Sequence, residues 1–278
     1  MCIRDRGIIA LGLASGLPTK EIVEIYEKYG PQIFPEAKTG LDGLIERMFH
    51  TRYDSTGLRE SLQKFLEQKS MSDVSENIAV TSFDTSNSKP VIFRSVYGKD
   101  NGQFNDVKLV DIALATSAAP TYFPAAEAGN SYMIDGGIWA NCPAMVGITE
   151  SLKFFNQNLR DIRILSIGTT TEPQFINRDQ QKGGLITWAK PIPSTIMHAT
   201  KLSTISQSND LAGFFHRIDT VVPPGRFSLD DTTAIGDLLA LGRSEAEENF
   251  PECKKKFFTR LARFRPENTQ VNKEPATA

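Results

Sequence analysis

Asp135 is the residue of this sequence with the clearest capacity for chemistry, because of the residues on either side of it. The apolar run at 132–134 predicts a short strand, and Gly136 and Gly137 predict a sharp turn after it. In open α/β sheets, ligands bind beyond the carboxyl ends of the strands. A carboxylate at such an end can take a proton from a nucleophile or hold it in position. Asp-Gly is also a common turn dipeptide, and these three residues by themselves favour that plainer interpretation.

The sequence contains no pattern typical of a metal, disulfide or nucleotide site. The cysteines lie far apart without C-x-x-C spacing, and no histidine lies at ligand spacing from another His or Cys. These residues are Cys2, Cys142 and Cys253, with His50, His198 and His216. G-x-G-x-x-G and the P-loop pattern are absent as well, so we expect no metal and no cofactor.

Composition indicates a folded globular chain rather than a disordered one. Of 278 residues, 40% are hydrophobic and 23% are charged, which is enough apolar content for a sizeable core. Lys plus Arg is 31 and Asp plus Glu is 33, giving a formal net charge of −2. That near-neutral balance argues against a nucleic-acid partner. No apolar run approaches the roughly 18 residues that a membrane-spanning helix requires.

Strands and helices that could position Asp135 alternate along the chain. Helices are predicted over residues 7–15, 19–29, 58–68, 107–118, 143–155, 185–206 and 233–249. Strands are predicted over 77–83, 90–96, 132–134, 161–168 and 214–222. Gly30-Pro31 is expected to stop the second helix. Strands separated by helices predict an α/β domain with a mostly parallel central sheet and helices on its faces.

Two longer segments surround Asp135: residues 111–124, DIALATSAAPTYFP, and residues 132–143, YMIDGGIWANCP. They resemble the patatin-like lipid acyl hydrolase family, which has an A-T-S-A-A-P-x-x-F-P segment followed by D-G-G or D-G-A and then N-x-P. Shorter matches lie at 52–58, 165–168 and 237–242, so the resemblance covers nearly all of residues 7–250. Each piece is weak by itself, and the ordered set is strong.

The resemblance implies a three-layer α/β/α patatin-like sandwich and a Ser–Asp dyad that cleaves ester bonds in lipids. By motif, Asp135 is the dyad carboxylate and proton acceptor, within the D-G-G motif Asp135, Gly136 and Gly137. A serine hydroxyl is a weak nucleophile until a base removes its proton, and an Asp can serve as that base. Cys142 departs from the family pattern, which often has a second Asn there, and we expect a small buried residue rather than a reactive thiol.

The serine nucleophile that the resemblance implies is missing from this sequence. A G-x-S-x-G elbow would hold the serine in a strained strand-to-helix turn, and no such pattern occurs. Residues 7–12, GIIALG, resemble the helix that follows the elbow, so the serine is expected among residues 3–5, which are Ile, Arg and Asp. Ser15-Gly16 comes too late, at the end of that helix.

We therefore expect an N-terminally incomplete domain. The missing part corresponds to the first βαβ unit of the fold, roughly 30 or more residues. Residues 1–6 are interpreted as a non-native junction, residues 7–262 as the patatin-like domain and residues 263–278 as a polar tail. A basic start followed by an apolar run also resembles a signal peptide, but cleavage would remove a helix that belongs to the core.

The expected parent protein is a serine lipid acyl hydrolase of the phospholipase A type that acts in lipid degradation. Without its serine, the chain as written is expected to be inactive. Its partner would be a lipid acyl ester, with peripheral membrane contact and a cytoplasmic or membrane-peripheral location rather than secretion. Lipid head group, chain length and oligomeric state stay open. The alternatives are a non-catalytic lipid-binding or regulatory patatin-like protein and, less favoured without a glycine-rich turn, a nucleotide-binding α/β protein.

Overall fold

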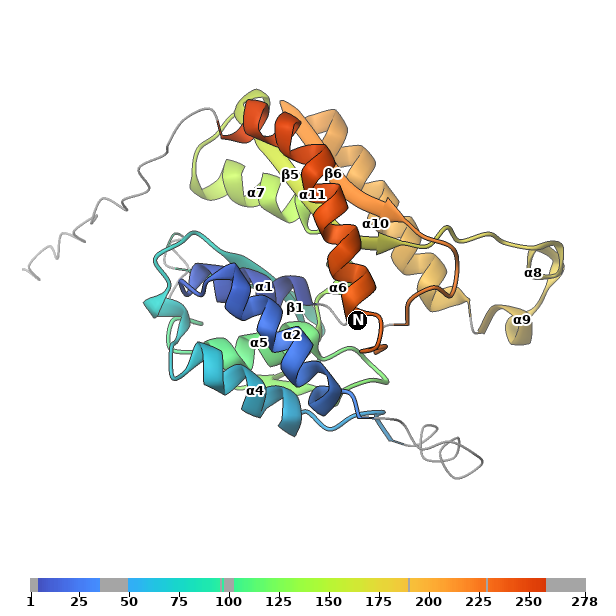
Figure 1. Ribbon diagram of the computed structural model, residues 1–278, viewed down its shortest axis with the longest axis horizontal. Helices are drawn as coiled ribbons and strands as arrows, with labels where there is room; N and C mark the ends of the chain where they lie inside the picture. The colour runs from blue at the N-terminus through green and yellow to red at the C-terminus, as the bar shows by residue number, and fades with distance from the viewer. Residues whose placement is uncertain are drawn as a thin grey trace, which may run out of the picture.

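A computed structural model describes residues 5–35, 50–95, 97, 103–189, 191–228 and 230–258 of the chain (Figure 1). The expected polar tail and residues 1–4 of the expected junction lie outside the described residues. Helix α1 (Asp5–Ala14) begins within the expected junction. The helix predicted from residue 7 is thus confirmed, with two more residues at its start.

The larger sheet of the described residues has four strands. These are β1 (Ala79–Asp84), β2 (Lys89–Arg94), β3 (Ala126–Ala128) and β4 (Ser131–Asp135), in the order β2-β1-β4-β3. Every neighbouring pair in this sheet is antiparallel. The prediction of a mostly parallel central sheet is therefore wrong for this part of the fold. β1 and β2, like β3 and β4, are joined by turns too short for the crossover that parallel strands need.

Strand β3 and its hairpin with β4 were not predicted. Gly129 and Asn130 have φ angles of 58° and 65°, the left-handed backbone that a type I′ hairpin turn requires at both central residues. A Gly-Asn pair between two short strands is a hairpin signal that can be read from sequence. This turn sets the register of β4, in which Ser131 pairs with Ala128.

The second sheet pairs β5 (Arg163–Thr171) with β6 (Phe214–Val221) in parallel. Helix α10 (Ile192–Leu211) makes the crossover between them, and α11 (Ile235–Phe257) follows β6. The two strands lie between α11 and α10 in Figure 1. This βαβ arrangement is what alternating strands and helices predict, and it confirms the α/β class.

The remaining helices cover the larger sheet, link it to the smaller one or, in the case of α8 and α9, project away from both. They are α2 (Thr19–Ile33), α4 (Thr56–Leu66), α5 (Leu109–Ser117), α6 (Gly137–Ala140), α7 (Ala144–Phe154), α8 (Arg178–Lys182) and α9 (Leu185–Ala189), with short 3-10 helices at Met71–Asp73 and Leu159–Asp161. Helix α5 packs against β1, β3 and β4 and also against α1 and α4. Every residue of α5 except Asp111 is buried, so this helix is the centre of the core.

Hydrophobic burial is concentrated in the first half of the chain. The contiguous core cluster is formed by buried residues between Ile8 and Met133, with Phe93 among the largest that are fully buried. Neither β5 nor β6 contains a buried residue. The smaller sheet is therefore held by partial burial and by polar contacts.

One predicted helix end is wrong for a reason that lies in the core. Helix α2 continues through Gly30-Pro31 to Ile33. Pro31 lacks one backbone donor, but Ile33 and the following Phe34 are buried, and the Phe34 ring lies 5.3 Å from the ring of Tyr53. Packing of these side chains stabilises the last turn that local sequence disfavours.

The helix predicted over residues 185–206 is divided into α9 and α10. Pro191 and Pro193 lie at the division, and α10 has a proline in its first turn. Proline is tolerated in a first turn because those N–H groups have no partner within the helix. The prolines therefore begin a new helix instead of continuing the previous one.

A buried carboxylate on α7 ties that helix to the edge of the larger sheet. Arg94 of β2 donates through Nε and Nη2 to Glu150, at 2.6 and 2.8 Å. The Tyr97 hydroxyl donates to the same carboxylate at 2.9 Å. Because Glu150 is only 6% exposed, a paired arginine is required to keep its charge buried.

Asp230, shortly before α11, makes a second link to the first half of the chain. Its Oδ2 accepts a hydrogen bond of 2.6 Å from the Tyr53 hydroxyl and lies 2.7 Å from Arg52 Nη1. Its Oδ1 accepts from the Ser228 hydroxyl at 2.6 Å. Burial raises the pKa of Asp230, but the hydrogen bonds and the Arg52 charge outweigh burial and hold that pKa below its ordinary value. Asp230 is therefore a charged acceptor at neutral pH.

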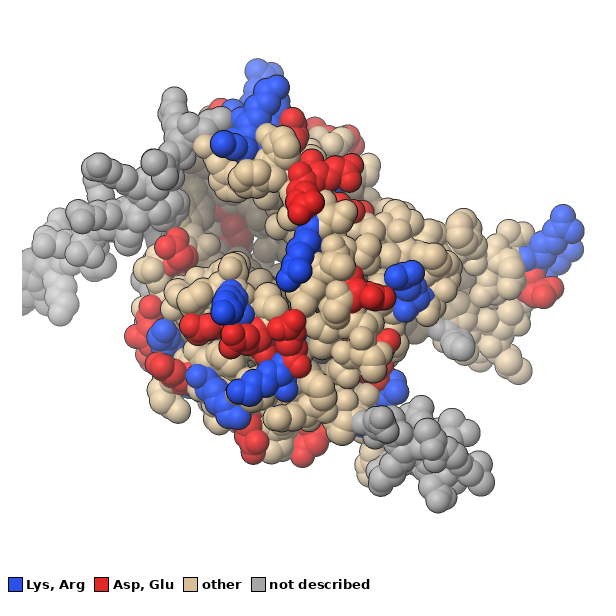
Figure 2. Space-filling model, in the orientation of Figure 1, with Lys and Arg blue, Asp and Glu red and all other residues tan. Residues whose placement is uncertain are grey.

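Charged side chains of both signs are interspersed over the face shown in Figure 2, and the projection that carries α8 and α9 is mostly uncharged. None of the helices in the described part of the chain is long and apolar enough to cross a membrane.

Replacing Asp230 by Asn is expected to remove a pH-dependent part of the stability. The folded-state pKa is lowered, so the contribution of Asp230 is present above its unfolded pKa of about 3.9 and is lost as pH falls through the folded-state value. Near neutral pH we expect the variant to unfold with about 1–3 kcal/mol less free energy. Urea denaturation at a series of pH values from neutral downward measures the difference, which should shrink in acid. Asp210→Asn, at an exposed position of α10, is the control; a difference for Asp230→Asn that does not change with pH would contradict the assignment.

Candidate active site

Asp135 is the last residue of β4 and is only 1% exposed. Its backbone N–H donates to the carbonyl of Ala118 at 3.0 Å, just after α5. Its Oδ1 accepts a hydrogen bond of 2.8 Å from the Gly137 N–H at the start of α6. The predicted strand and turn are confirmed. Within the turn, the Gly137 backbone N–H holds the Asp135 carboxylate in position.

Gly136 lies against the backbone of β1. A Cβ at this position would overlap the carbonyl carbon and oxygen of Thr81. Gly136 has a φ of −65°, so its backbone conformation is ordinary and the requirement for glycine is one of space alone. The first glycine of the motif therefore lets the chain pass directly over β1 after Asp135.

Side chains that sequence reasoning did not single out form the floor beneath this turn. Ser82 pairs with Asp135 across the two strands and is fully buried. Its hydroxyl donates to the carbonyl of Ile134 at 2.7 Å and to that of Ala115 at 3.2 Å. Trp139 Nε1 donates to the Ser82 carbonyl at 2.9 Å, holding α6 onto β1. The sequence around Asp135 does not indicate these roles, because Ser82 lies far away along the chain. Pairing of β1 with β4 brings the two residues together.

The first turn of α1 lies beside the same strand end. A Cβ on Gly7 would lie 2.5 Å from Cγ2 of Thr116 in α5, so the two helices touch there. Thr116 in turn donates to the Thr81 carbonyl at 2.8 Å. Arg6 donates to the backbone carbonyl of Asn141 and, at 3.1 Å, to its side-chain oxygen. Helix α1 is therefore adjacent to the segment that contains Asp135.

The positions predicted for a nucleophilic serine cannot be placed beside this carboxylate. Residues 1–4 and the Asp5 side chain lie outside the described residues. The described serines at the site have other roles: Ser82 bonds to two carbonyls, and Ser117, 1% exposed, donates to the Ala113 carbonyl at 2.6 Å. Both hydroxyls are buried and act as donors to the backbone.

Cys142 is a buried free thiol, as the sequence interpretation expected. Its Sγ lies 3.9 Å from the Ser166 hydroxyl and 3.8 Å from Arg217 Nη1. Arg217 also pairs with Asp219 at 2.7 Å, and Lys201 Nζ lies 3.8 Å from the same carboxylate. Burial and nearby cations, offset in part by Asp219, lower the pKa of Lys201. This charged group belongs to β5, β6 and α10 and adjoins the site at Cys142.

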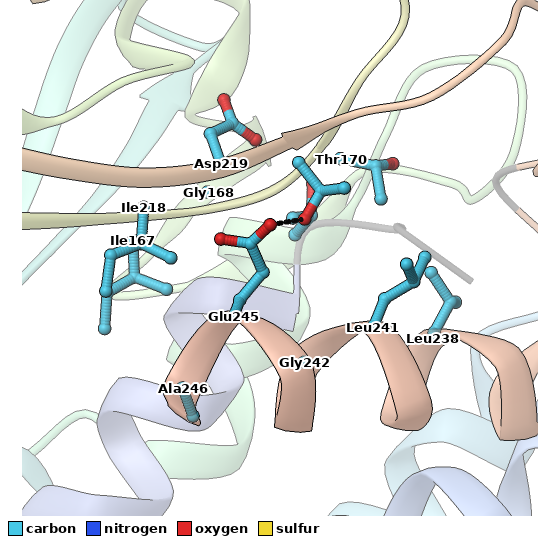
Figure 3. A pocket seen from close by; sticks show the side chains of 12 residues that line it. Ile167, Gly168, Thr170, Ile218, Asp219, Leu238, Leu241, Gly242, Glu245 and Ala246 are labelled. Carbon is cyan, nitrogen blue, oxygen red and sulfur yellow. Dashed lines mark hydrogen bonds between the residues drawn. The ribbon is translucent and has the colours of Figure 1, made fainter. Parts of the chain in front are cut away.

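Two cavities of about 320 Å³ each lie along α11, and Asp135 lines neither. One separates α11 from the strands β5 and β6; Figure 3 shows Glu245, Leu241 and Leu238 pointing from α11 toward these strands. The Thr220 hydroxyl donates to Glu245 at 2.8 Å within it. The other lies between α11, α1 and α2 and is almost wholly apolar. Leu238 lines both.

No group of three or more His, Cys, Asp or Glu residues that could hold a metal ion occurs in the part of the chain that the structure describes. The described site presents a buried carboxylate fixed at a strand end, with a helix start on one side and a short helix on the other.

These elements define an α/β protein whose conspicuous polar site is the carboxylate of a D-G-G turn. The model of the patatin-like phospholipase family matches residues 7–148, from α1 into α7. Because that match covers more than half of the chain, the chain belongs to the patatin-like phospholipase family. Membership supports a lipid hydrolase function at the level of the family.

Relatives with curated names extend the similarity beyond that segment. The chain is 28% identical over 277 residues to a cGAMP-activated phospholipase of Vibrio cholerae, covering 89% of this chain and 78% of the relative. It is 28% identical over 275 residues to a cGAMP-activated phospholipase of Escherichia coli, covering 90% and 77%. It is also 26% identical over 251 residues to a protein of Solanum tuberosum named probable inactive patatin-3-Kuras 1, covering 80% and 65%.

Gly136→Ala is expected to destabilise the fold, because the added methyl would have to displace the Thr81 backbone. Overpacking of this kind costs about 1–3 kcal/mol, or more where only backbone can move. The matched control is Gly147→Ala in α7, where no atom lies within 4 Å of the new Cβ; that change should leave stability equal or raise it by up to about 1 kcal/mol. Chemical denaturation of both variants measures the contrast, and equal stabilities would show that β1 and Gly136 are not in contact.

Proposed function

We propose that Asp135 is the carboxylate of a Ser–Asp dyad in a patatin-like serine lipid acyl hydrolase. The observation that carries the proposal is the fixed, buried carboxylate at the end of β4, with Oδ1 held by the Gly137 N–H and the first turn of α1 beside it. Helix α1 resembles the helix that follows a nucleophile elbow, so its start is where a serine would face Asp135. Family membership supports the lipid ester as the substrate class.

The reaction would proceed in two displacement steps. The serine oxygen attacks the acyl carbonyl carbon while its proton passes to Asp135. The carbon–oxygen bond to the lipid alcohol then breaks, and the proton leaves with that alcohol. Asp135 next takes a proton from water, whose oxygen attacks the acyl-serine. The fatty acid departs, and the proton returns to the serine oxygen.

The chain as written would not perform this reaction, because its sequence contains no G-x-S-x-G elbow. We propose that residues 1–6 replace native sequence encoding the elbow, that residues 7–262 form the patatin-like domain and that residues 263–278 are a polar tail. The second candidate function, a non-catalytic lipid-binding or regulatory protein, is favoured by the same missing elbow. The native gene sequence upstream of codon 7 distinguishes the two.

Asp135→Asn in the parent protein, with the upstream coding sequence recovered, is expected to lower phospholipid and generic ester hydrolysis by orders of magnitude. Asparagine keeps the acceptor for the Gly137 N–H but cannot take the serine proton. Asp210→Asn, at an exposed position, is the control and should leave turnover unchanged. Fatty-acid release measures activity, and urea denaturation checks that the fold is intact. Near-normal turnover of Asp135→Asn would remove Asp135 from the mechanism; a native frame without an elbow would favour the non-catalytic alternative.

Regulation by a cyclic dinucleotide is a further part of the proposal, favoured by the two relatives named cGAMP-activated phospholipase that align with about nine-tenths of this chain. A ligand that binds only the folded state raises thermal stability, and the gain grows with the logarithm of one plus the ratio of the free ligand concentration to Kd. We expect cGAMP to raise the unfolding temperature of this chain and to release or absorb heat in titration calorimetry. An equimolar mixture of AMP and GMP is the control. Equal behaviour with the two additions would contradict this part of the proposal.

A further inference from the structure

Residues 173–189, which we call the arm, leave the body of the protein between β5 and α10. Figure 1 shows the arm projecting away from both sheets, with α8 and α9 at its end. No residue of α8 or α9 is buried. Its two short helices therefore contribute nothing to the hydrophobic core.

Large apolar side chains of the arm are exposed to an unusual degree. Phe175 is 81% exposed, Leu185 is 82% exposed and Ile186 is 93% exposed. Isolated exposed apolar residues are ordinary, but a group of this size on one projection indicates a surface that binds something.

The arm is ordered by local hydrogen bonds, so its exposure is not that of an unstructured loop. The Asn177 side chain accepts from the Gln180 N–H at 2.8 Å, and the Gln180 side chain accepts from the Asn177 N–H at 2.9 Å. This reciprocal pair caps α8. At the base, Lys201 of α10 donates to the Thr171 hydroxyl at 2.6 Å, fixing the point at which the chain leaves β5.

The arm has a small net positive charge. Arg178 and Lys182 of α8 outnumber Asp179, so the arm is net positive while the whole chain has a formal charge of −2. Figure 2 shows blue and red side chains together at the tip of a projection that is otherwise uncharged. Trp188 in α9 adds an aromatic side chain of the kind that prefers the boundary between water and lipid. Apolar side chains with adjacent cations fit an anionic lipid surface.

The apolar surface continues from the arm towards the candidate site. Ile192 and Ile196, in the first turns of α10, are 39% and 55% exposed. The next residue, Met197, accepts a hydrogen bond at 3.3 Å from the side chain of Asn141, which directly follows α6. Helix α10 thus runs from the arm to a contact near the D-G-G turn. A surface that the arm binds would lie on that side of the molecule.

We propose that the arm is a lipid-docking element that places Phe175, Leu185 and Ile186 in the interface of an anionic bilayer. The choice of lipid as partner rests on the proposed lipid hydrolase function. A second copy of this chain, bound through the same residues, is the competing occupant that the test must distinguish.

The test uses the full chain and vesicles of phosphatidylcholine with or without phosphatidylglycerol. We expect co-sedimentation that is stronger with phosphatidylglycerol and about tenfold weaker for Leu185→Ser/Ile186→Ser and for Phe175→Ser. Phe250→Ser on α11, where the phenylalanine is 57% exposed, is the matched control and should bind as the unaltered chain does. Arg178→Gln/Lys182→Gln should reduce only the phosphatidylglycerol-dependent part, with Lys20→Gln as its control.

A second measurement reports insertion directly. The chain has two tryptophans, so Trp139→Phe leaves Trp188 as the single indole. Its fluorescence should shift to shorter wavelength when vesicles are added. Absence of vesicle binding, equal binding by arm variants and Phe250→Ser, or no shift of Trp188 would overturn the proposal. A concentration-dependent dimer in light scattering that arm variants abolish, with no vesicle binding, would assign the surface to a second copy. None of these readouts requires hydrolysis, so the proposal and the proposed activity can fail separately.

Discussion

The pairing of β1 with β4 is the constraint on which the candidate site depends. Asp135, at the buried end of β4, pairs with Ser82 of β1. The next residue, Gly136, then crosses the Thr81 backbone. A slip of one residue would turn every side chain of β4 to the other face of the sheet. Hydrogen bonds from Ser82 and Thr116 to neighbouring backbone carbonyls oppose such a slip from within the core.

Burial is unequal between the two sheets, and this gives the two halves different sources of stability. The larger sheet shares the core of residues 8–133, whereas β5 and β6 have no buried residue. The second half is joined to the first by carboxylates on α7 and before α11, at Glu150 and Asp230.

Much of the secondary structure follows from sequence periodicity, and the departures have physical causes. The helix at 109–117 and the strands at 79–84 and 163–171 lie where the apolar pattern predicts them. Helix α2 passes Gly30-Pro31 because its last turn is packed in the core. Two of the three antiparallel pairs in the larger sheet are hairpins, and alternation of element types does not report which strands are joined by turns.

The sequence by itself determined the family resemblance, the α/β class and the selection of Asp135, Gly136 and Gly137, because these depend on residue types and spacings along the chain. Only the tertiary structure decided why Gly136 must lack a Cβ, that Ser82 supports the turn and that the arm stands away from the core. Those properties depend on which distant segments touch, and contact between segments far apart in sequence leaves little trace in local pattern.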